Sequence, residues 1–191
     1  MSTTLILKNA RLAFPDLFEA KQFDGKGPFT YGATFLMAPD SAEKVAVEAA
    51  MKEAADAKWG AKATEVLKAI RAGGSQKCCF VSGDSKTYDG FAGNWSLSAK
   101  RQQDSGHPKI VVYNPTSKEF DDLSPSDGKP YAGCYVTGKV EIWAQDNSFG
   151  KAIRATLIAV QFTKDGDAFS ATGPADVGGL EAVEDDGADL A

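Results

Sequence analysis

Apolar residues recur at two different periods along this chain, and each period predicts a different kind of element. Residues 4–14 alternate as a strand that is expected to end at Pro15, and residues 29–37 resume the same alternation. Residues 21–28 between them are polar and contain glycine and proline, which predicts a loop. The amino-terminal part should therefore be β-structure.

Helical spacing replaces this alternation after residue 39. Asp40 and Glu43 form a pair like a capping box, which predicts that a helix starts at Asp40. Apolar residues over positions 47–59 share one side of this helix, and Gly60 is a natural stop. A second, shorter helix is predicted over residues 63–72.

The chain returns to a strand pattern after the helices. Turn-forming pairs such as Asp89-Gly90 and Asn114-Pro115 separate the candidate strands. Strands, one helical insert and then more strands predict a mainly β fold with a helical insert, of the α+β or β-barrel kind. The later strands are predicted at residues 77–82, 93–99, 110–113, 134–144 and 151–163.

Charge divides the chain at Asp165. Residues 1–164 hold 21 basic and 18 acidic residues, a net charge of +3, whereas residues 165–191 hold eight acidic residues and no basic one. Segments of one charge sign that contain glycine rarely fold and often bind partners. We expect a folded domain over residues 1–164 and a flexible acidic tail over 165–191, with partner-binding acids at Glu181, Glu184, Asp185, Asp186 and Asp189.

Composition narrows the class of protein. No apolar run approaches the roughly 18–20 residues of a membrane span, and no signal peptide is apparent, so a cytoplasmic protein is expected. Cys78, Cys79 and Cys134 are an odd set with two neighbours, which favours free, buried thiols over a disulfide framework. With His107 as the one histidine, no metal or other cofactor is expected.

The strand predicted at residues 134–144 has two contrasting faces. Its even-numbered positions are apolar or small and suit a core, whereas Tyr135, Lys139 and Trp143 lie on the opposite face. An exposed aromatic ring offers a nucleobase a surface for stacking, worth about 1–3 kcal/mol per base. The pattern leaves open whether Trp143 serves in this way or is covered by a helix or loop.

Basic and aromatic residues also alternate after residue 87. Cations that meet phosphates beside rings that meet bases suit a single-stranded nucleic acid. Trp95 shares a strand face with Leu97, so a core position remains an alternative for it. Residues 102–108 form a polar loop that could close over a ligand. The candidate residues here are Tyr88, Phe91, Trp95, Lys100, Arg101, Lys109 and Tyr113, and Lys151 and Arg154 add charge beside Trp143.

The sequence contains few of the residue patterns that an enzyme would need. A single histidine excludes most nucleophile–histidine schemes, and no phosphate-binding glycine motif is present. We therefore expect a protein that is not an enzyme. The weaker alternative is a metal-dependent nuclease that uses some of the carboxylates Asp84, Asp121, Asp122, Asp127 and Asp146, although aspartates in such loops usually form turns.

Six short segments together resemble a known family. They are residues 9–19, 31–37, 58–60, 89–95, 131–136 and 159–162, and they span most of residues 5–164. In order and spacing they resemble the phage single-stranded-DNA-binding proteins typified by that of phage Enc34.

The resemblance implies an oligonucleotide-binding (OB) fold, a small Greek-key barrel whose face and loops hold nucleic acid. It also implies a role in phage DNA replication or recombination within the host-cell cytoplasm. As in the T7-type phage proteins, the acidic tail would compete with DNA for the basic groove and recruit a polymerase, helicase or nuclease. Deletion of residues 165–191 should then tighten DNA binding. Both monomers and homodimers are compatible with this class, and a non-catalytic virion or assembly module is the alternative.

Overall fold

The computed structural model describes residues 2–170, and its strands form one continuous sheet. The sheet has the order β3-β4-β2-β1-β7-β8-β5-β6. The strands are β1 (Ser2–Phe23), β2 (Lys26–Met37), β3 (Phe80–Ser82), β4 (Trp95–Gln102), β5 (Lys109–Asn114), β6 (Glu119–Asp122), β7 (Tyr135–Asn147) and β8 (Gly150–Lys164).

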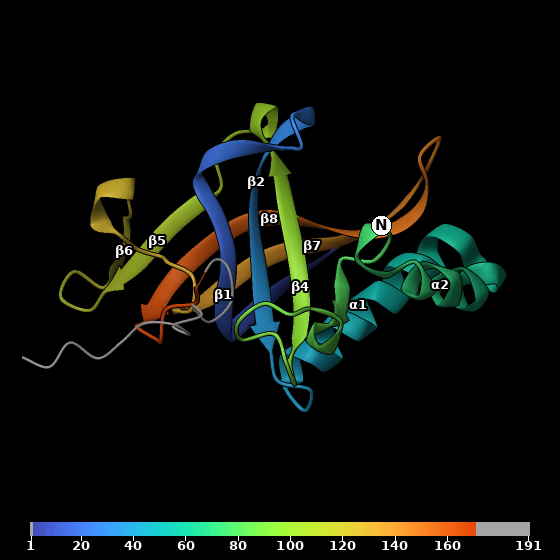
Figure 1. Cartoon of the computed structure of the whole chain (residues 1–191), viewed down its shortest axis with the longest axis horizontal. Helices are drawn as coiled ribbons and strands as arrows, with labels where there is room; N and C mark the ends of the chain where they lie inside the picture. Colours follow the sequence, from blue (N-terminus) through green and yellow to red (C-terminus); the bar gives the residue numbers. More distant parts are fainter. Residues whose placement is uncertain (1, 171–191) are drawn as a thin grey trace, which may run out of the picture.

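A further pairing closes part of this sheet into a barrel. Strand β4 runs parallel to β8, with Lys100 opposite Thr156, so β4, β2, β1, β7 and β8 form a closed ring (Figure 1). The neighbouring pairs within the ring are antiparallel. Five strands with one parallel closure make an OB-type barrel, which confirms the fold expected from the sequence.

The barrel interior is filled by the inward faces of these strands. Phe35, Leu97, Val140 and Leu157 are completely buried there. Gly138 leaves room for the Phe35 ring, because a Cβ at this glycine would lie 2.5 Å from the ring. The alternation predicted for residues 134–144 is confirmed, since the even-numbered positions from Cys134 to Ile142 are all buried.

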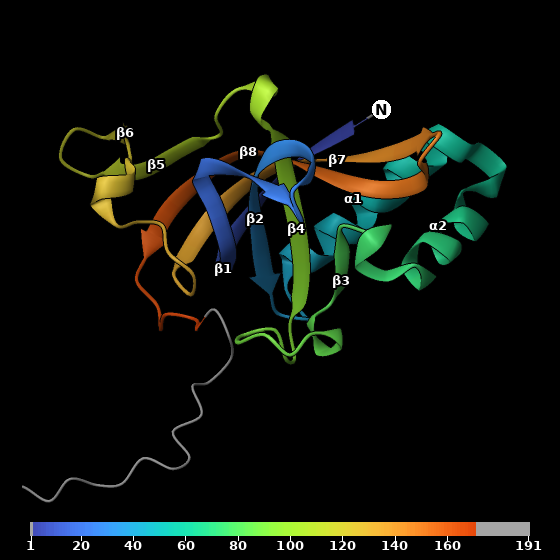
Figure 2. The same cartoon turned by 45° about the horizontal axis from the view of Figure 1, so that its top comes forward.

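The helical insert covers one end of the barrel. Helix α1 (Ala42–Trp59) packs on β1 and β7 through the predicted apolar side, and α2 (Ala63–Ala72) packs on α1. The helices and the β5–β6 hairpin lie at opposite ends of the molecule (Figure 1, Figure 2). Among the described residues, no helix combines the length and apolarity needed to cross a membrane.

The predicted start of the first helix is wrong by one residue. Ser41 is the N-cap, and its Oγ accepts a hydrogen bond of 3.2 Å from the Lys44 amide. Asp40 lies in the preceding turn, so the expected pair of Asp40 and Glu43 does not form the cap. The stop at Gly60 is confirmed, with a positive φ of 53°.

The predicted end of the first strand at Pro15 is also wrong. Strand β1 continues to Phe23, because Phe14 and Pro15 form a bulge opposite Ala33, where proline needs no ladder partner. Residues 21–28 accordingly belong mostly to a hairpin, whose turn lies at Asp24 and Gly25. The bulge gives Phe14 a φ of 48° and leaves its side chain 44% exposed.

Candidate nucleic-acid interface

A groove of about 650 Å³ runs across the outer side of the barrel where β4 meets β8. We call it the central groove. Cationic and aromatic side chains line it from three strands: Lys100 and Arg101 from β4, Trp143 from β7 and Arg154 from β8. Four of the residues predicted to bind single-stranded DNA are thus brought together, although they are far apart in the chain.

Neighbouring side chains fix the aromatic part of the central groove. Trp143 and Arg154 are paired residues of adjacent strands, so both side chains lie on the same face. The Trp143 Nε1 donates a hydrogen bond of 3.1 Å to the Thr156 hydroxyl. Arg154 donates to the Gln145 side chain at 3.3 Å and to the Gln76 carbonyl at 2.9 Å. The indole ring is therefore held in place and forms part of the lining of the central groove.

Arg101 joins the groove to the loop that follows β4. Its guanidinium donates to the carbonyls of Ser105 and Gly106 at 2.6 and 2.7 Å. His107 of the same loop lies against Tyr31, with ring centroids 4.8 Å apart. These contacts hold the loop predicted at residues 102–108 beside the groove, and Ser105 forms part of its lining.

A second hollow of about 240 Å³ extends the central groove along β4. We call it the connecting hollow. It shares Lys100, Ser98, Cys79 and Ser75 with the central groove and adds Lys86 from the turn after β3. Burial raises the pKa of the Cys79 thiol well above its ordinary value, so this wall of the path is uncharged at neutral pH.

The path ends in a cluster of three aromatic rings. Phe14 lies 4.8 Å from Tyr88 and 6.0 Å from Phe91 between ring centroids, and Tyr88 lies 5.6 Å from Phe91. These rings line both the connecting hollow and an adjoining pocket of about 330 Å³, which we call the aromatic pocket. The three hollows thus form one path across the barrel face.

Four cations along this path have no acidic partners. Within residues 2–170, no carboxylate lies at ion-pair distance from Lys86, Lys100, Arg101 or Arg154. Positive charge that the protein leaves unbalanced is available to the phosphates of a ligand.

Several predicted binding residues lie outside the path. Lys109 is paired with Asp122 at 2.9 Å, and Tyr113 packs on Phe120 at 5.5 Å, both on the β5–β6 hairpin. Lys151 is paired with Asp146 at 3.4 Å near the β7–β8 turn. Their predicted contacts with DNA stay predictions.

The remaining candidates divide between the core and the outer side of β7. Trp95 packs on Phe80 with ring centroids 5.0 Å apart, which supports the core alternative. Tyr135 lies between Arg11 and Lys164, whose charged groups are 5.5 and 4.3 Å from its ring. Lys139 is exposed farther along the strand, outside the lining of the path.

Sequence reasoning missed Phe14 and Lys86 as members of the path. Phe14 was assigned to an ordinary strand, whereas the bulge turns it toward Tyr88. Lys86 follows a short strand as an isolated lysine, before the cluster of basic and aromatic residues that begins at Tyr88. The acids Glu181, Glu184, Asp185, Asp186 and Asp189 of the predicted tail lie outside the described residues.

The carboxylates considered for a nuclease do not converge. Among residues 2–170, no group of three His, Cys, Asp or Glu side chains is placed to hold a metal ion. Hydrogen bonds from Ser124 lower the pKa of Asp127, and a hydrogen bond from the Trp59 ring lowers that of Asp146. Asp84 accepts a hydrogen bond of 2.7 Å from the Gly93 amide. These three acids thus serve local turns and contacts.

Comparison with known proteins gives consistent matches. The family model described as the ssDNA-binding protein of Enterobacter phage Enc34 matches residues 3–188. "Putative protein p50" of Acyrthosiphon pisum secondary endosymbiont phage 1 is 40% identical over 172 residues, which are 90% of this chain and 89% of the relative.

Solved structures share the fold. The single-stranded DNA-binding protein from bacteriophage Enc34, in complex with ssDNA, is similar with a TM-score of 0.68 and 24% identity, covering 87% of this chain and 89% of that one. The gp2.5 protein of bacteriophage T7, a single-stranded DNA-binding protein, has a TM-score of 0.52 and 12% identity, with 100% of both chains covered. Because the family model matches almost the whole length of this chain, the chain belongs to the Enc34 family of phage ssDNA-binding proteins.

Proposed function

We propose that this protein binds single-stranded DNA along the path from Trp143 to Phe14, without marked sequence preference. The observation that carries the proposal is the combination of four unbalanced cations with aromatic rings in one continuous path. Cations that meet phosphates and rings that stack on any base give binding that tolerates sequence. Membership of the Enc34 family supports the same function.

The protein would act by binding alone, as a non-catalytic component of phage DNA replication or recombination in the host-cell cytoplasm. The acidic residues beyond residue 170 would compete with DNA for the cations of the path. They would also recruit replication proteins such as a polymerase, helicase or nuclease. Residues 165 and 167 are the two tail acids within the described part of the chain.

Fluorescence anisotropy of a labelled oligo-dT tests this function. Chains 1–191 and 1–170 should both give saturable binding that weakens with salt, and the shorter chain should bind more tightly at low salt because six competing acids are removed. Absence of binding by both chains at low salt would favour the assembly-module alternative. Equal affinities of the two chains would instead refute the competition by the tail.

A further inference from the structure

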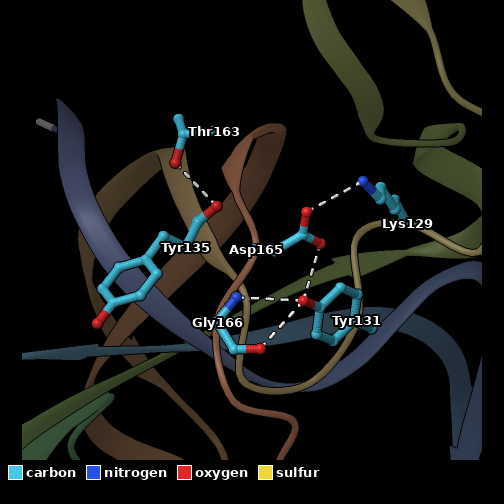
Figure 3. A network of polar contacts seen from close by, with 6 residues as sticks. All are labelled: Lys129, Tyr131, Tyr135, Thr163, Asp165 and Gly166. Atoms are coloured by element: carbon cyan, nitrogen blue, oxygen red, sulfur yellow. Dashed lines mark hydrogen bonds and ion pairs between the residues drawn. The ribbon is translucent and has the colours of Figure 1, made fainter.

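Residues 165–170 follow β8 and lie against the barrel. The Gly166 amide donates to the Tyr131 hydroxyl at 3.1 Å, and this hydroxyl lies 2.9 Å from the Asp165 carboxylate (Figure 3). Arg11 donates to the Asp167 carbonyl at 2.6 Å. The Phe169 amide donates to the Ala132 carbonyl at 3.0 Å. This segment, which the sequence assigns to the acidic tail, is thus attached to the body by several hydrogen bonds.

Two glycines leave room for the segment. A Cβ at Gly133 would lie 2.1 Å from the Asp167 carbonyl oxygen, and a Cβ at Gly90 would lie 2.2 Å from the tip of the Phe169 ring. Both glycines also have positive φ, of 101° and 79°. Side chains at either position would displace the segment, so the body is shaped to receive it.

Phe169 forms one wall of the aromatic pocket. Its ring lies under the Arg11 guanidinium, 4.3 Å from charge centre to ring centroid. Phe14, Tyr88 and Phe91 line the same pocket. The pocket volume of about 330 Å³ lies at the lower end of the range of small-molecule sites, about 300–1,000 Å³.

The charges at the pocket favour an uncharged ligand. Asp16 and Asp89 line it, and Asp16 is paired with Lys21 at 2.5 Å. The lining has two carboxylates and one paired lysine, and Arg11, which lies over Phe169, donates its hydrogen bonds to the carbonyls of Gly133 and Asp167. Among the described residues, this arrangement leaves no lining cation free for a phosphate, whereas carboxylates accept hydrogen bonds from the amino and imino groups of bases. Aromatic walls suit the flat faces of a base.

We infer that the aromatic pocket takes one nucleobase from the end of the bound strand, and that Phe169 helps to hold it. Residues 165–170 are then part of the DNA-binding site and not of the competing tail. The inference rests on the proposed function, because the pocket continues the path through Phe14, Tyr88 and Phe91. It predicts opposite effects from two neighbouring deletions.

Anisotropy with oligo-dT and three chain lengths measures these effects. Chain 1–170 should bind more tightly than 1–191, whereas chain 1–164 should bind at least about fivefold more weakly than 1–170, the low end for one stacked base. Phe169→Ala within chain 1–170 should cause a comparable loss. If chain 1–164 and the Phe169→Ala variant bind as tightly as 1–170, the inference is wrong.

Phe120→Ala within chain 1–170 is the matched control. Phe120 is an exposed ring that packs on Tyr113 away from the path, so its loss should leave affinity unchanged. Thermal melting checks that the variants fold, because the half-buried Phe169 packs against the buried residues Ala13, Leu36 and Phe91. If chain 1–170 itself fails to bind, the proposed function fails. A loss of affinity in chain 1–164 and in Phe169→Ala, but not in Phe120→Ala, supports the binding of a base in the aromatic pocket.

Photochemical crosslinking locates the base directly. Oligo-dT with single 5-iododeoxyuridine substitutions forms adducts with aromatic residues that stack on the halogenated base. Adducts at Phe14, Tyr88 or Phe169 are expected for one end of the strand, and mass spectrometry identifies the residue. Adducts confined to Trp143, with binding intact, would place every stacked base in the central groove and would overturn the inference.

Discussion

Replacing one groove lysine should change the salt dependence of DNA binding by a calculable amount. Each phosphate contact on a single strand contributes about 0.7 to the slope of log K against log salt. If Lys86, Lys100, Arg101 and Arg154 each meet one phosphate, the slope is about −2.8. Lys100→Ala should reduce it to about −2.1.

These slopes predict measurable affinities. Between about 50 and 200 mM salt, the affinity of chain 1–170 for DNA should fall about 50-fold, and that of its Lys100→Ala variant about 20-fold. Anisotropy of labelled oligo-dT with chain 1–170 over a salt series gives both values, without interference from the residues beyond 170. Lys100 is exposed on β4, so its truncation should not disturb the core.

Lys109→Ala is the matched control for this prediction. The Lys109 Nζ bonds both carboxylate oxygens of Asp122, at 2.9 and 3.0 Å, and the residue lies on β5 outside the path. If DNA follows the path alone, replacement of Lys109 should leave the slope unchanged, whereas the contact predicted for Lys109 from the sequence would reduce it. An unchanged slope for Lys100→Ala, or an equal reduction for Lys109→Ala, would refute the assignment of phosphates to the path.

Three other variants test separate parts of the structure. Trp143→Ala should weaken oligo-dT binding by about 1–3 kcal/mol if one base stacks on the indole, and unchanged affinity in a titration would contradict stacking there. Ser41→Ala should lower the free energy of unfolding by about 1 kcal/mol, because the Lys44 amide of α1 loses its hydrogen bond to the cap. Urea denaturation measures this change, and an unchanged free energy would show that the cap does not stabilise the protein. Burial raises the pKa of Cys79 above the ordinary 9.0, so the unfolded chain loses this proton first as the pH rises. Thermal stability should therefore be retained below pH 9 and decline above it. Replacement Cys79→Ala should make this decline less steep. A pH profile that is the same in both proteins would show that the Cys79 thiol does not cause the decline.

The barrel strands could be predicted because burial on one face imposes a period of two. In β7, Val136, Val140 and Ile142 face the core, while Trp143 lies on the opposite face, as the alternation indicated. The end of helix α1 at Gly60 could also be predicted from the sequence, because the positive φ at this position favours glycine. Local pattern thus identifies the elements and the face on which each side chain lies.

The composition of the path could not be read from the sequence in the same way. It depends on the pairing of β4 with β8, which brings Lys100 beside Thr156 from a distant part of the chain. It also depends on the bulge that turns Phe14 outward. Strand β6 shows no alternation, since all four of its residues are exposed, so the pairing of Lys109 with Asp122 had no sequence signal.

The most direct test of the central claim is intrinsic tryptophan fluorescence of chain 1–170 during titration with oligo-dT, at low and at high salt. Trp143 lies in the central groove, whereas Trp59 bonds Asp146 and Trp95 packs on Phe80. Saturable quenching at low salt that weakens at high salt and disappears in Trp143→Phe is the predicted result. No change in fluorescence at low salt, together with no anisotropy change of the labelled strand, would contradict single-stranded DNA binding by this protein.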